Sequence, residues 1–177
     1  MAWTNKFGTH YNLADIAEQL LTRPPEKASC AGTHLLYSLT VLIRVDECEP
    51  FLPVLVREKI KVHLLKVVRT LVLSQRDGAW TPAWSTRSES RKPSLHESTG
   101  GAAWEDVLVT GHQLEWMILL PSDMVPAKEC LVRGANFLLR GLESAAPDTL
   151  EAFYCPYSHA ARVLRLLTRD DSVVANR

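Results

Sequence analysis

Apolar residues recur at intervals of three and four positions along almost the whole chain of 177 residues. This spacing puts them on one face of an α-helix, and it predicts six helices. The expected helices cover residues 12–23, 32–45, 51–74, 105–120, 126–143 and 157–169. Because no alternating run has a partner with which to build a sheet, the sequence predicts an all-α fold. We expect one domain over residues 1–177, arranged as consecutive antiparallel helical hairpins.

Two segments depart from the common helical pattern. The helix expected at 32–45 is apolar on nearly every face, which predicts that it is buried on all sides. Residues 81–104 are rich in Ser, Thr, Arg, Gly and Pro, and they predict a polar loop longer than compact domains usually carry. This loop is either a lid over a site or a disordered insertion. Trp84 and Trp104 lie near the ends of this loop. If they are buried, the loop packs on the fold, whereas exposed tryptophans would indicate binding of a partner.

Composition excludes several classes of function. Lys and Arg together number 20, as do Asp and Glu, so the net charge is zero and a nucleic-acid partner is not expected. The longest apolar run, near residues 35–43, is too short to span a bilayer. The first residues lack the apolar segment of a secretory signal. We therefore expect a cytoplasmic protein without a transmembrane segment, whose four cysteines are reduced.

Histidines recur at corresponding places in three of the expected helices. Thr33-His34-Leu35, Gly111-His112-Gln113 and Ser158-His159-Ala160 each place a small or hydroxylated residue before a histidine and an apolar helix. If these three helices form an inner layer and run in one direction, the three imidazoles lie on a common rim. Helix N-termini at that rim would favour an anion. Each histidine alone could instead cap or pack its own helix.

A shared rim would form a concave pocket for a small organic ligand or a partner. The expected ligand-binding residues are His34, Tyr37, Tyr157 and His159. His112 and Glu115 are three positions apart on a helix, so they share a face and are candidate catalytic residues for acid–base chemistry.

Two other interpretations stay open. Cys30-x-x-x-His34 and Cys155-x-x-x-His159 repeat one spacing and supply the donor types of a zinc enzyme, so these four residues are the candidate metal ligands. The third interpretation is a non-catalytic helical scaffold that binds other proteins through tryptophans. The chain has no Gly-rich phosphate loop, Gly-x-Ser-x-Gly elbow, His-Glu-x-x-His or Cys-x-x-Cys motif. Whether it is an enzyme stays undecided.

The stretch Gln75-Arg76-Asp77-Gly78-Ala79-Trp80 resembles the Q…G-x-W motif of squalene and oxidosqualene cyclases. It is also similar to stretches in the wider terpene-cyclase and protein-prenyltransferase α/α toroids. The resemblance implies a structural role, in which Gln75 faces the end of the preceding helix and Trp80 packs over the turn. Gly111-His112-Gln113-Leu114-Glu115-Trp116 resembles a stretch of N-acylglucosamine 2-epimerases whose histidine is catalytic.

The resemblance also implies an architecture. A complete toroid needs about a dozen helices and this chain supplies six, so we expect about half of an α/α toroid. The Asp-x-Asp-Asp motif of the cyclases is missing, which implies a degenerate relative. An open arc leaves apolar edges uncovered, and covering them is favourable by roughly 25 cal/mol per Å². We therefore expect a homodimer, or a second domain or chain that completes the ring.

Overall fold

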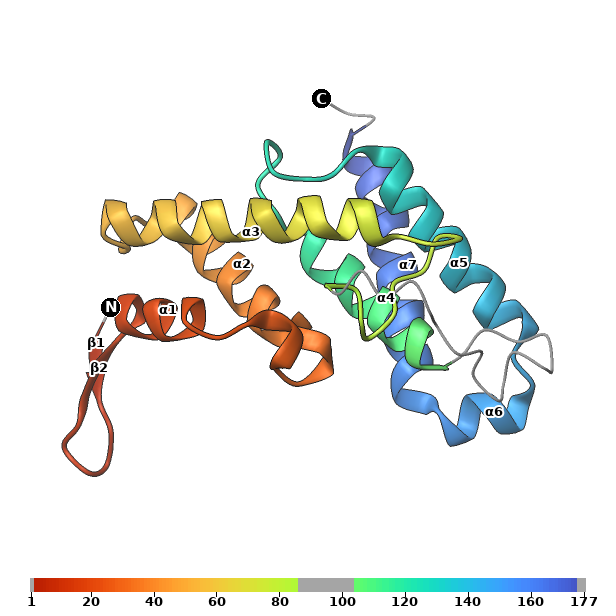
Figure 1. Cartoon of the computed structure of the whole chain (residues 1–177), viewed down its shortest axis with the longest axis horizontal. Coiled ribbons are helices and arrows are strands. Elements are labelled where there is room, and N and C mark those ends of the chain that lie inside the picture. Colours follow the sequence, from red (N-terminus) through yellow and green to blue (C-terminus); the bar gives the residue numbers. More distant parts are fainter. Residues whose placement is uncertain (1, 86–103, 175–177) are drawn as a thin grey trace.

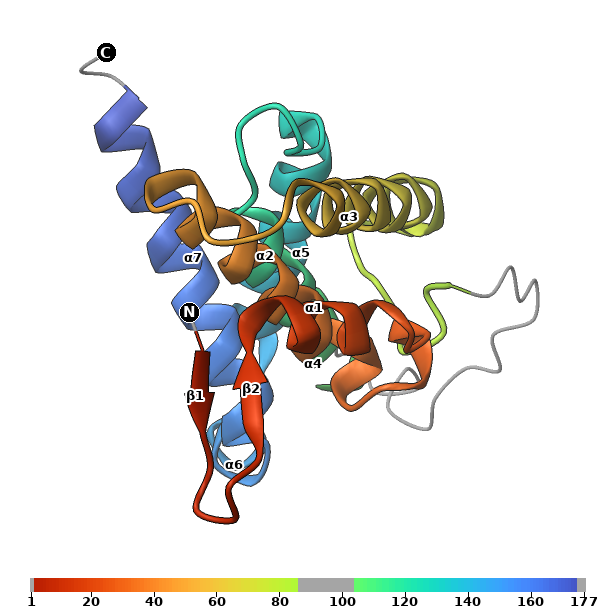
Figure 2. The ribbon, with the colours of Figure 1, turned by 90° about the vertical axis from the view of Figure 1, so that its left-hand side faces the viewer.

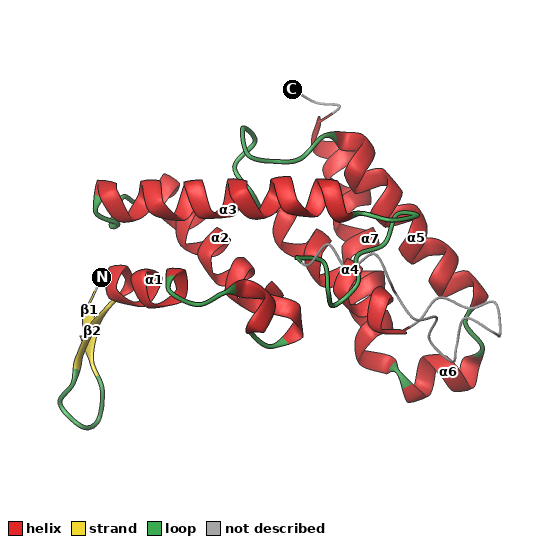
Figure 3. Cartoon of the chain, in the orientation of Figure 1, coloured by secondary structure: helices red, strands yellow, loops and turns green. Residues whose placement is uncertain are grey.

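The computed structural model describes residues 2–85 and 104–174, without the side chains of residues 26 and 169–174. Seven α-helices and one small sheet make up this part of the chain (Figures 1 and 3). The strands are β1 (Ala2–Thr4) and β2 (His10–Asn12). The helices are α1 (Leu13–Leu21), α2 (Thr33–Cys48), α3 (Val54–Ser74), α4 (Trp104–Met117), α5 (Lys128–Ser144), α6 (Pro147–Ala152) and α7 (Tyr154–Val174). All six expected helices are present, so the predicted helical class is confirmed.

The strands and α6 are the elements that the sequence did not predict. β1 and β2 pair antiparallel as a hairpin at the N-terminal end. Its turn is closed by Asn5, whose Oδ1 accepts from the backbone N–H of Phe7 at 2.9 Å and of Thr9 at 3.0 Å. Gly8 in the turn has a φ of +79°, which suits glycine. Strands of three residues are too short for an alternating pattern to reveal them, and this small hairpin is an addition to a chain that is otherwise helical.

The helices pack as two groups of three. α1, α2 and α3 contact one another, as do α4, α5 and α7, and the groups meet where α2 packs on α4. Figure 1 shows α4, α5 and α7 side by side, with the β-hairpin at the opposite end of the molecule, and Figure 2 shows the hairpin projecting from the start of α1. The most extensive packing joins α4 to α7, which are separated in sequence by α5 and α6. A simple succession of hairpins therefore does not describe the main helix contacts.

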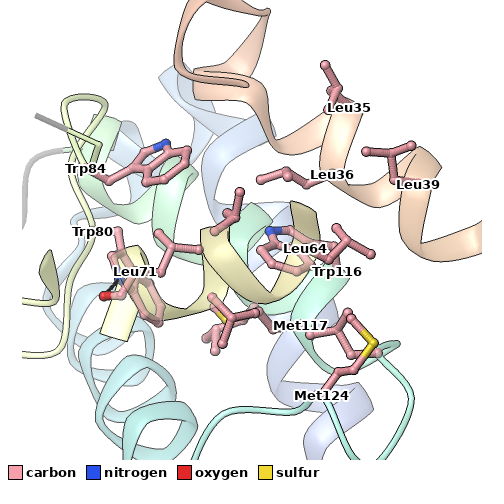
Figure 4. Close-up of a cluster of buried hydrophobic side chains, with 14 of the residues drawn as sticks. Leu35, Leu36, Leu39, Leu64, Leu71, Trp80, Trp84, Trp116, Met117 and Met124 are labelled. Carbon is pink, nitrogen blue, oxygen red and sulfur yellow. Dashed lines mark hydrogen bonds between the residues drawn. The ribbon is translucent and has the colours of Figure 1, made fainter. Parts of the chain in front are cut away.

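The most deeply surrounded helix is α4, not α2. Every residue from 109 to 117 is buried, including His112, Gln113 and Glu115. In α2, by contrast, Val41 and Val45 are exposed, so the expectation that the 32–45 helix is buried on all sides was wrong. Figure 4 shows the core between the two groups, where side chains of α2, α3 and α4 meet. Leu36, Leu64, Leu71, Trp80 and Trp116 are among its fully buried members.

The connection between α2 and α3 depends on one buried carboxylate. Asp46 accepts from the backbone N–H of Phe51 at 2.8 Å and of Leu52 at 2.7 Å, and it pairs with the guanidinium of Arg57. Burial alone would raise the pKa of Asp46. The hydrogen bonds from Arg57, Leu52 and Phe51 outweigh burial and lower the pKa to about 2. This buried charge therefore has its partners within the protein.

The turn after α3 has the structural role that its sequence implies. Trp80 Nε1 donates to the carbonyl of Leu71 at 2.9 Å, so the indole lies over the end of α3. Gln75 Nε2 donates to the carbonyls of Gly78 at 3.1 Å and Cys130 at 3.0 Å, which joins the turn to α5. Gly78 has a φ of +91°, and a Cβ there would lie 2.4 Å from the carbonyl oxygen of Arg133. Glycine is required at this close approach.

The tryptophans near the polar loop pack into the molecule. Trp84 is buried and donates to the carbonyl of Ala31 at 2.9 Å, and Trp104 stacks on Phe153 with ring centroids 5.2 Å apart. Trp80 and Trp116 are fully buried and Trp104 is partly buried, so of the two alternatives for the tryptophans the structure favours packing for these four. The expected lid at 81–104 lies mostly outside the described residues. In the part of the chain that is described, no helix combines the length and apolarity needed to cross a bilayer.

Candidate functional site

Three imidazoles from three separate helices meet at one place. His34 comes from α2, His112 from α4 and His159 from α7. The rings of His34 and His112 are perpendicular, with centroids 5.3 Å apart. The centroids of His112 and His159 are 3.9 Å apart, and their Nε2 atoms lie within hydrogen-bond distance at 3.1 Å. The structure thus brings together the three histidines that the sequence repeat singled out.

The histidines do not all lie at helix N-termini. His34 is the second residue of α2, but α4 begins at Trp104, so His112 lies past the middle of its helix. The expectation of three helix N-termini around one rim was therefore wrong. Gly111 explains how His112 reaches its partner, because a Cβ at Gly111 would lie 3.3 Å from the backbone N of Ala160. The missing side chain lets α7 approach α4 closely and brings His159 beside His112.

A buried carboxylate completes a chain of polar contacts. His159 Nδ1 lies 3.0 Å from Glu115 Oε1, and Arg162 Nη1 lies 3.7 Å from the same oxygen. His112 and Glu115 share α4, but the hydrogen bonds run from His112 to His159 and from His159 to Glu115. The side chain of His159 is 25% exposed and that of Glu115 only 6%. Among the three hydrogen-bonded residues His112, His159 and Glu115, His159 is therefore the one that solvent reaches most easily.

His112 is a buried base with one unused nitrogen. Burial, together with the nearby His159 and His34, lowers the pKa of His112 to about 4, so its ring is neutral at pH 7. Its Nδ1 has no hydrogen-bond partner among the described residues. A carboxylate accepts hydrogen bonds, so the contact with Glu115 places the proton of a neutral His159 ring on Nδ1. His159 Nε2 is then an acceptor, and it receives the hydrogen bond from His112 Nε2–H. In this arrangement the lone pair of His112 lies on the unpartnered Nδ1.

The cluster forms the wall of a pocket of about 330 Å³. Besides the three histidines, α2 contributes the hydroxyl groups of Thr33, Tyr37 and Ser38. Glu115 and Arg162 add one acidic and one basic group. The volume falls in the range of small-molecule sites. Every lining side chain carries a polar atom, which suits a ligand with several hydrogen-bonding groups.

Two predicted site residues lie away from this pocket. Tyr157 is buried in the core and does not line the pocket, so the structure does not bring it together with His34, Tyr37 and His159. The reason is geometric, because residues two positions apart on a helix face different sides and His159 is the one that faces the pocket. Cys155 is exposed, and its sulfur does not form a close group with the donor atoms of Cys30, His34 and His159. The predicted set of four metal ligands therefore does not form.

The structure instead assembles two other groups of possible metal ligands. Cys30, His34 and His112 form one, and His112, Glu115 and His159 form the other. In each group, one donor atom from every residue lies within 4.8 Å of the other two. His112 is common to both, which makes it the centre of the whole site.

Arg162 and Gly111 are site residues whose positions the sequence analysis did not identify. Arg162 lies three positions after His159 on α7, so the i, i+3 rule that linked His112 to Glu115 would have placed it on the pocket side. Gly111 stood in the repeat as a small residue, but its role depends on the approach of a second helix, which no local pattern reveals.

Comparisons with known proteins place the chain in no group: no known protein family, curated protein or solved structure matches it.

Proposed function

We propose that the chain binds a small polar organic molecule in the pocket between α2, α4 and α7. The observation that carries this proposal is the convergence of three imidazoles on one concave site of about 330 Å³. A cluster of this kind is costly for a merely structural role, because it buries Glu115 and leaves a nitrogen of His112 without a partner among the residues that the structure describes. Arg162 at the rim favours a ligand with a carboxylate, since a guanidinium matches that group.

The same site has the parts for proton transfer. His159 is hydrogen-bonded to Glu115, and a histidine oriented by a carboxylate can act as a general acid or base near neutral pH. The sequence-based candidates were His112 and Glu115. We propose that His159 exchanges the proton with the ligand, that Glu115 orients it, and that His112 supports it from the buried side. This assignment makes an acid–base enzyme the natural extension of a binding site.

Ligand binding is tested with a panel of small hydroxy and amino carboxylates, detected by changes in the NMR signals of labelled protein. We expect at least one compound to shift the signals of His34 and His159 in a saturable manner. The shifts disappear in His159→Ala and persist in His10→Ala, a control that removes an exposed histidine of the β-hairpin. The proposal fails if no compound shifts the pocket signals, or if the two variants behave alike.

The arrangement of α2, α4 and α7 supports the proposal of a partial α/α toroid. These three helices carry the histidines and pack as successive neighbours, α2 on α4 and α4 on α7. A half ring would use such a series as its inner layer, with α1, α3 and α5 outside. The pocket would then lie on the concave side, as expected for a toroid.

A second proposal concerns partners, because the long helix α3 has an exposed apolar stripe. The exposed apolar side chains of α3 lie on one face of the helix and include Val54, Leu55, Val62, Val72 and Leu73. Glu58 and Arg69 are exposed along the same stripe. We propose that this face binds a second copy of the chain, with the two α3 helices antiparallel.

The order of residues along the stripe favours this partner. When two copies of α3 cross about a twofold axis near its midpoint, Val54 faces Leu73, Glu58 faces Arg69 and Val62 faces Leu65. Apolar side chains then meet apolar ones, and each copy places an acid opposite a base. A stripe complementary to itself is what a symmetric dimer requires.

Sedimentation of charge-reversed variants tests the dimer. Glu58→Lys or Arg69→Glu alone would face like charges across the axis and weaken association, whereas the double variant restores the opposite charges. Glu129→Lys on α5 is the control, because Glu129 is exposed outside the stripe. A wild-type chain that stays monomeric at high micromolar concentration contradicts the proposal, as does a double variant no better than the single ones.

A further inference from the structure

We propose that Cys30, His34 and His112 form a zinc site whose fourth position opens into the pocket. One donor atom from each residue lies within 4.8 Å of the other two. Zinc takes thiolate sulfur at about 2.3 Å and imidazole nitrogen at about 2.0 Å, so its tetrahedral ligands lie roughly 3.3–3.6 Å apart. Closing this group onto an ion thus needs movements of about 1 Å, which small side-chain rotations supply. The inference does not depend on the identity of the organic ligand.

His112 has one ring nitrogen that forms no hydrogen bond with any described residue. A buried polar atom normally has a partner, and His112 Nδ1 has none among the described residues. Its Nε2 is engaged by His159. We infer that this lone pair is the one that His112 offers to a metal ion shared with Cys30 and His34.

The backbone just before α2 has an unusual conformation that positions Cys30. Cys30 and Ala31 each have a φ of +52°, followed by Gly32 at +81°. Residues other than glycine adopt this left-handed conformation at a cost, and they persist in it only where the surroundings hold them. Here Trp84 donates to the carbonyl of Ala31 at 2.9 Å, and Pro25 leaves no room for a side chain at position 32. The turn is therefore fixed, and it holds Cys30 in the group with His34 and His112.

His112 also has a second group that supports its ring. Histidines that bind a metal usually donate their other ring N–H to a second group, which fixes the tautomer and the orientation of the ring. His112 has such a group in His159, which is in turn hydrogen-bonded to Glu115. These contacts of His112 and His159 are the ones that a metal-binding histidine needs.

The choice between the two overlapping ligand groups follows from these contacts. In the group of His112, Glu115 and His159, the donor atoms already satisfy one another at 3.0 and 3.1 Å. An ion there would have to break both contacts. An ion bound by Cys30, His34 and His112 would instead use His112 Nδ1, which has no other partner among the described residues.

The donor set indicates zinc rather than a harder cation. One thiolate and two imidazoles suit zinc, whereas magnesium and calcium take oxygen ligands. Three protein ligands with an open fourth position are typical of catalytic rather than structural zinc. The open position would face the pocket that His34 and His112 line, where water or a donor atom of the organic ligand would complete the coordination.

The test measures zinc binding to the full chain by calorimetry, with metal content determined after dialysis. We expect one zinc per chain in the wild type. Cys30→Ser, His34→Ala and His112→Leu each weaken binding by more than about 100-fold, the upper end of the effect of losing an outer contact. Cys155→Ser is the matched control, since Cys155 has the same spacing to a histidine but is exposed outside the group. This control should bind zinc within about twofold of the wild type.

Cobalt in place of zinc gives a readout that a merely structural role would not change. Ligation by Cys30 produces thiolate-to-cobalt absorption in the wild type and in Cys155→Ser, and none in Cys30→Ser. Circular dichroism of each variant without metal establishes that it folds. The proposal is overturned if the wild type binds no zinc, if Cys30→Ser retains it, or if Glu115→Gln abolishes binding while Cys30→Ser does not. Since the organic ligand is tested with carboxylates, either proposal can fail alone.

Discussion

Asp46 and His112 are both buried polar side chains, but their surroundings differ in one respect. The carboxylate of Asp46 has two backbone N–H donors and the guanidinium of Arg57. The imidazole of His112 has a partner on Nε2 and none on Nδ1 among the described residues. A buried polar group with all its partners within the chain stabilises the fold. One with an unsatisfied atom costs free energy, and for His112 we propose that a metal ion offsets this cost.

The largest effect on stability is expected from replacing Asp46, the buried side chain whose partners all lie within the chain. Asp46→Ala removes the acceptor of two backbone N–H groups at the start of α3, and each unsatisfied buried donor costs about 1–3 kcal/mol. We expect the free energy of unfolding to fall by about 3 kcal/mol, measured by urea denaturation. Glu47→Ala is the control, because its ion pair with Arg44 is exposed and should contribute less than about 0.5 kcal/mol. Equal effects of the two substitutions would contradict the role of Asp46.

Acid should weaken the same contact in a defined range. The pKa of Asp46 is about 2 in the folded chain and 3.8 as the ordinary value, so the folded state favours its charged form. The resulting stability is complete above about pH 4 and is lost as the pH falls through 2. We expect a loss of about 1.5 kcal/mol over this range, less than the full shift implies because water reaches Arg57. His112 affects stability between pH 6.5 and 4, outside this range.

Asp46→Asn provides the measurement for that window. Unfolding of the wild type and of this variant is compared at pH 4 and pH 2, and the difference between the two proteins should shrink at the lower pH. A difference that stays constant would mean that Asp46 does not lose a stabilising charge there.

Replacing His112, the buried side chain with an unsatisfied nitrogen, should not lower stability as replacing Asp46 does. His112→Leu removes the buried nitrogen that has no partner, and the apolar side chain suits the surroundings of α4. His159 is a quarter exposed, so water can replace the contact that it loses. We expect the metal-free variant to be as stable as the wild type or more stable by up to about 1 kcal/mol, by urea denaturation with chelator present. A loss of more than about 1 kcal/mol would show that Nδ1 has a partner within the fold.

The smallest effect is expected at the approach of the helices that carry the cluster. Gly111→Ala gains up to about 1 kcal/mol of helix propensity, offset by crowding against the backbone of Ala160. We expect stability to change by less than about 0.5 kcal/mol, while the nuclear Overhauser contacts between the rings of His112 and His159 weaken. Unchanged contacts would indicate that α7 adjusts without moving His159.

The sequence predicts the helices well because their apolar spacing is a local property. It does not predict which helix lies at the centre. Thr110, His112, Gln113 and Glu115 are polar, so hydropathy gives no sign that α4 buries all four. Their burial depends on groups that arrive from distant segments, such as Trp80, whose backbone N–H donates to Thr110 at 2.9 Å. Hydropathy along the chain contains no record of these contacts.

The site shows the same division between local and distant information. The repeat identified His34, His112 and His159, and all three meet. It also paired Cys30 with Cys155, because both precede a histidine by four positions. The two differ in structure, since α7 begins at Tyr154 and includes Cys155, whereas Cys30 lies before α2 in a left-handed turn. Equal spacing therefore gives one cysteine in the cluster and one on the surface.

The most direct test is the protonation of the two ring nitrogens of His112, measured by ¹⁵N NMR of labelled histidine at pH 7 with chelator present. The account predicts a neutral ring with its proton on Nε2 and an unprotonated Nδ1, whose signal alone shifts strongly when zinc is added. A proton on Nδ1, or a zinc-dependent shift at Nε2 instead, would contradict it.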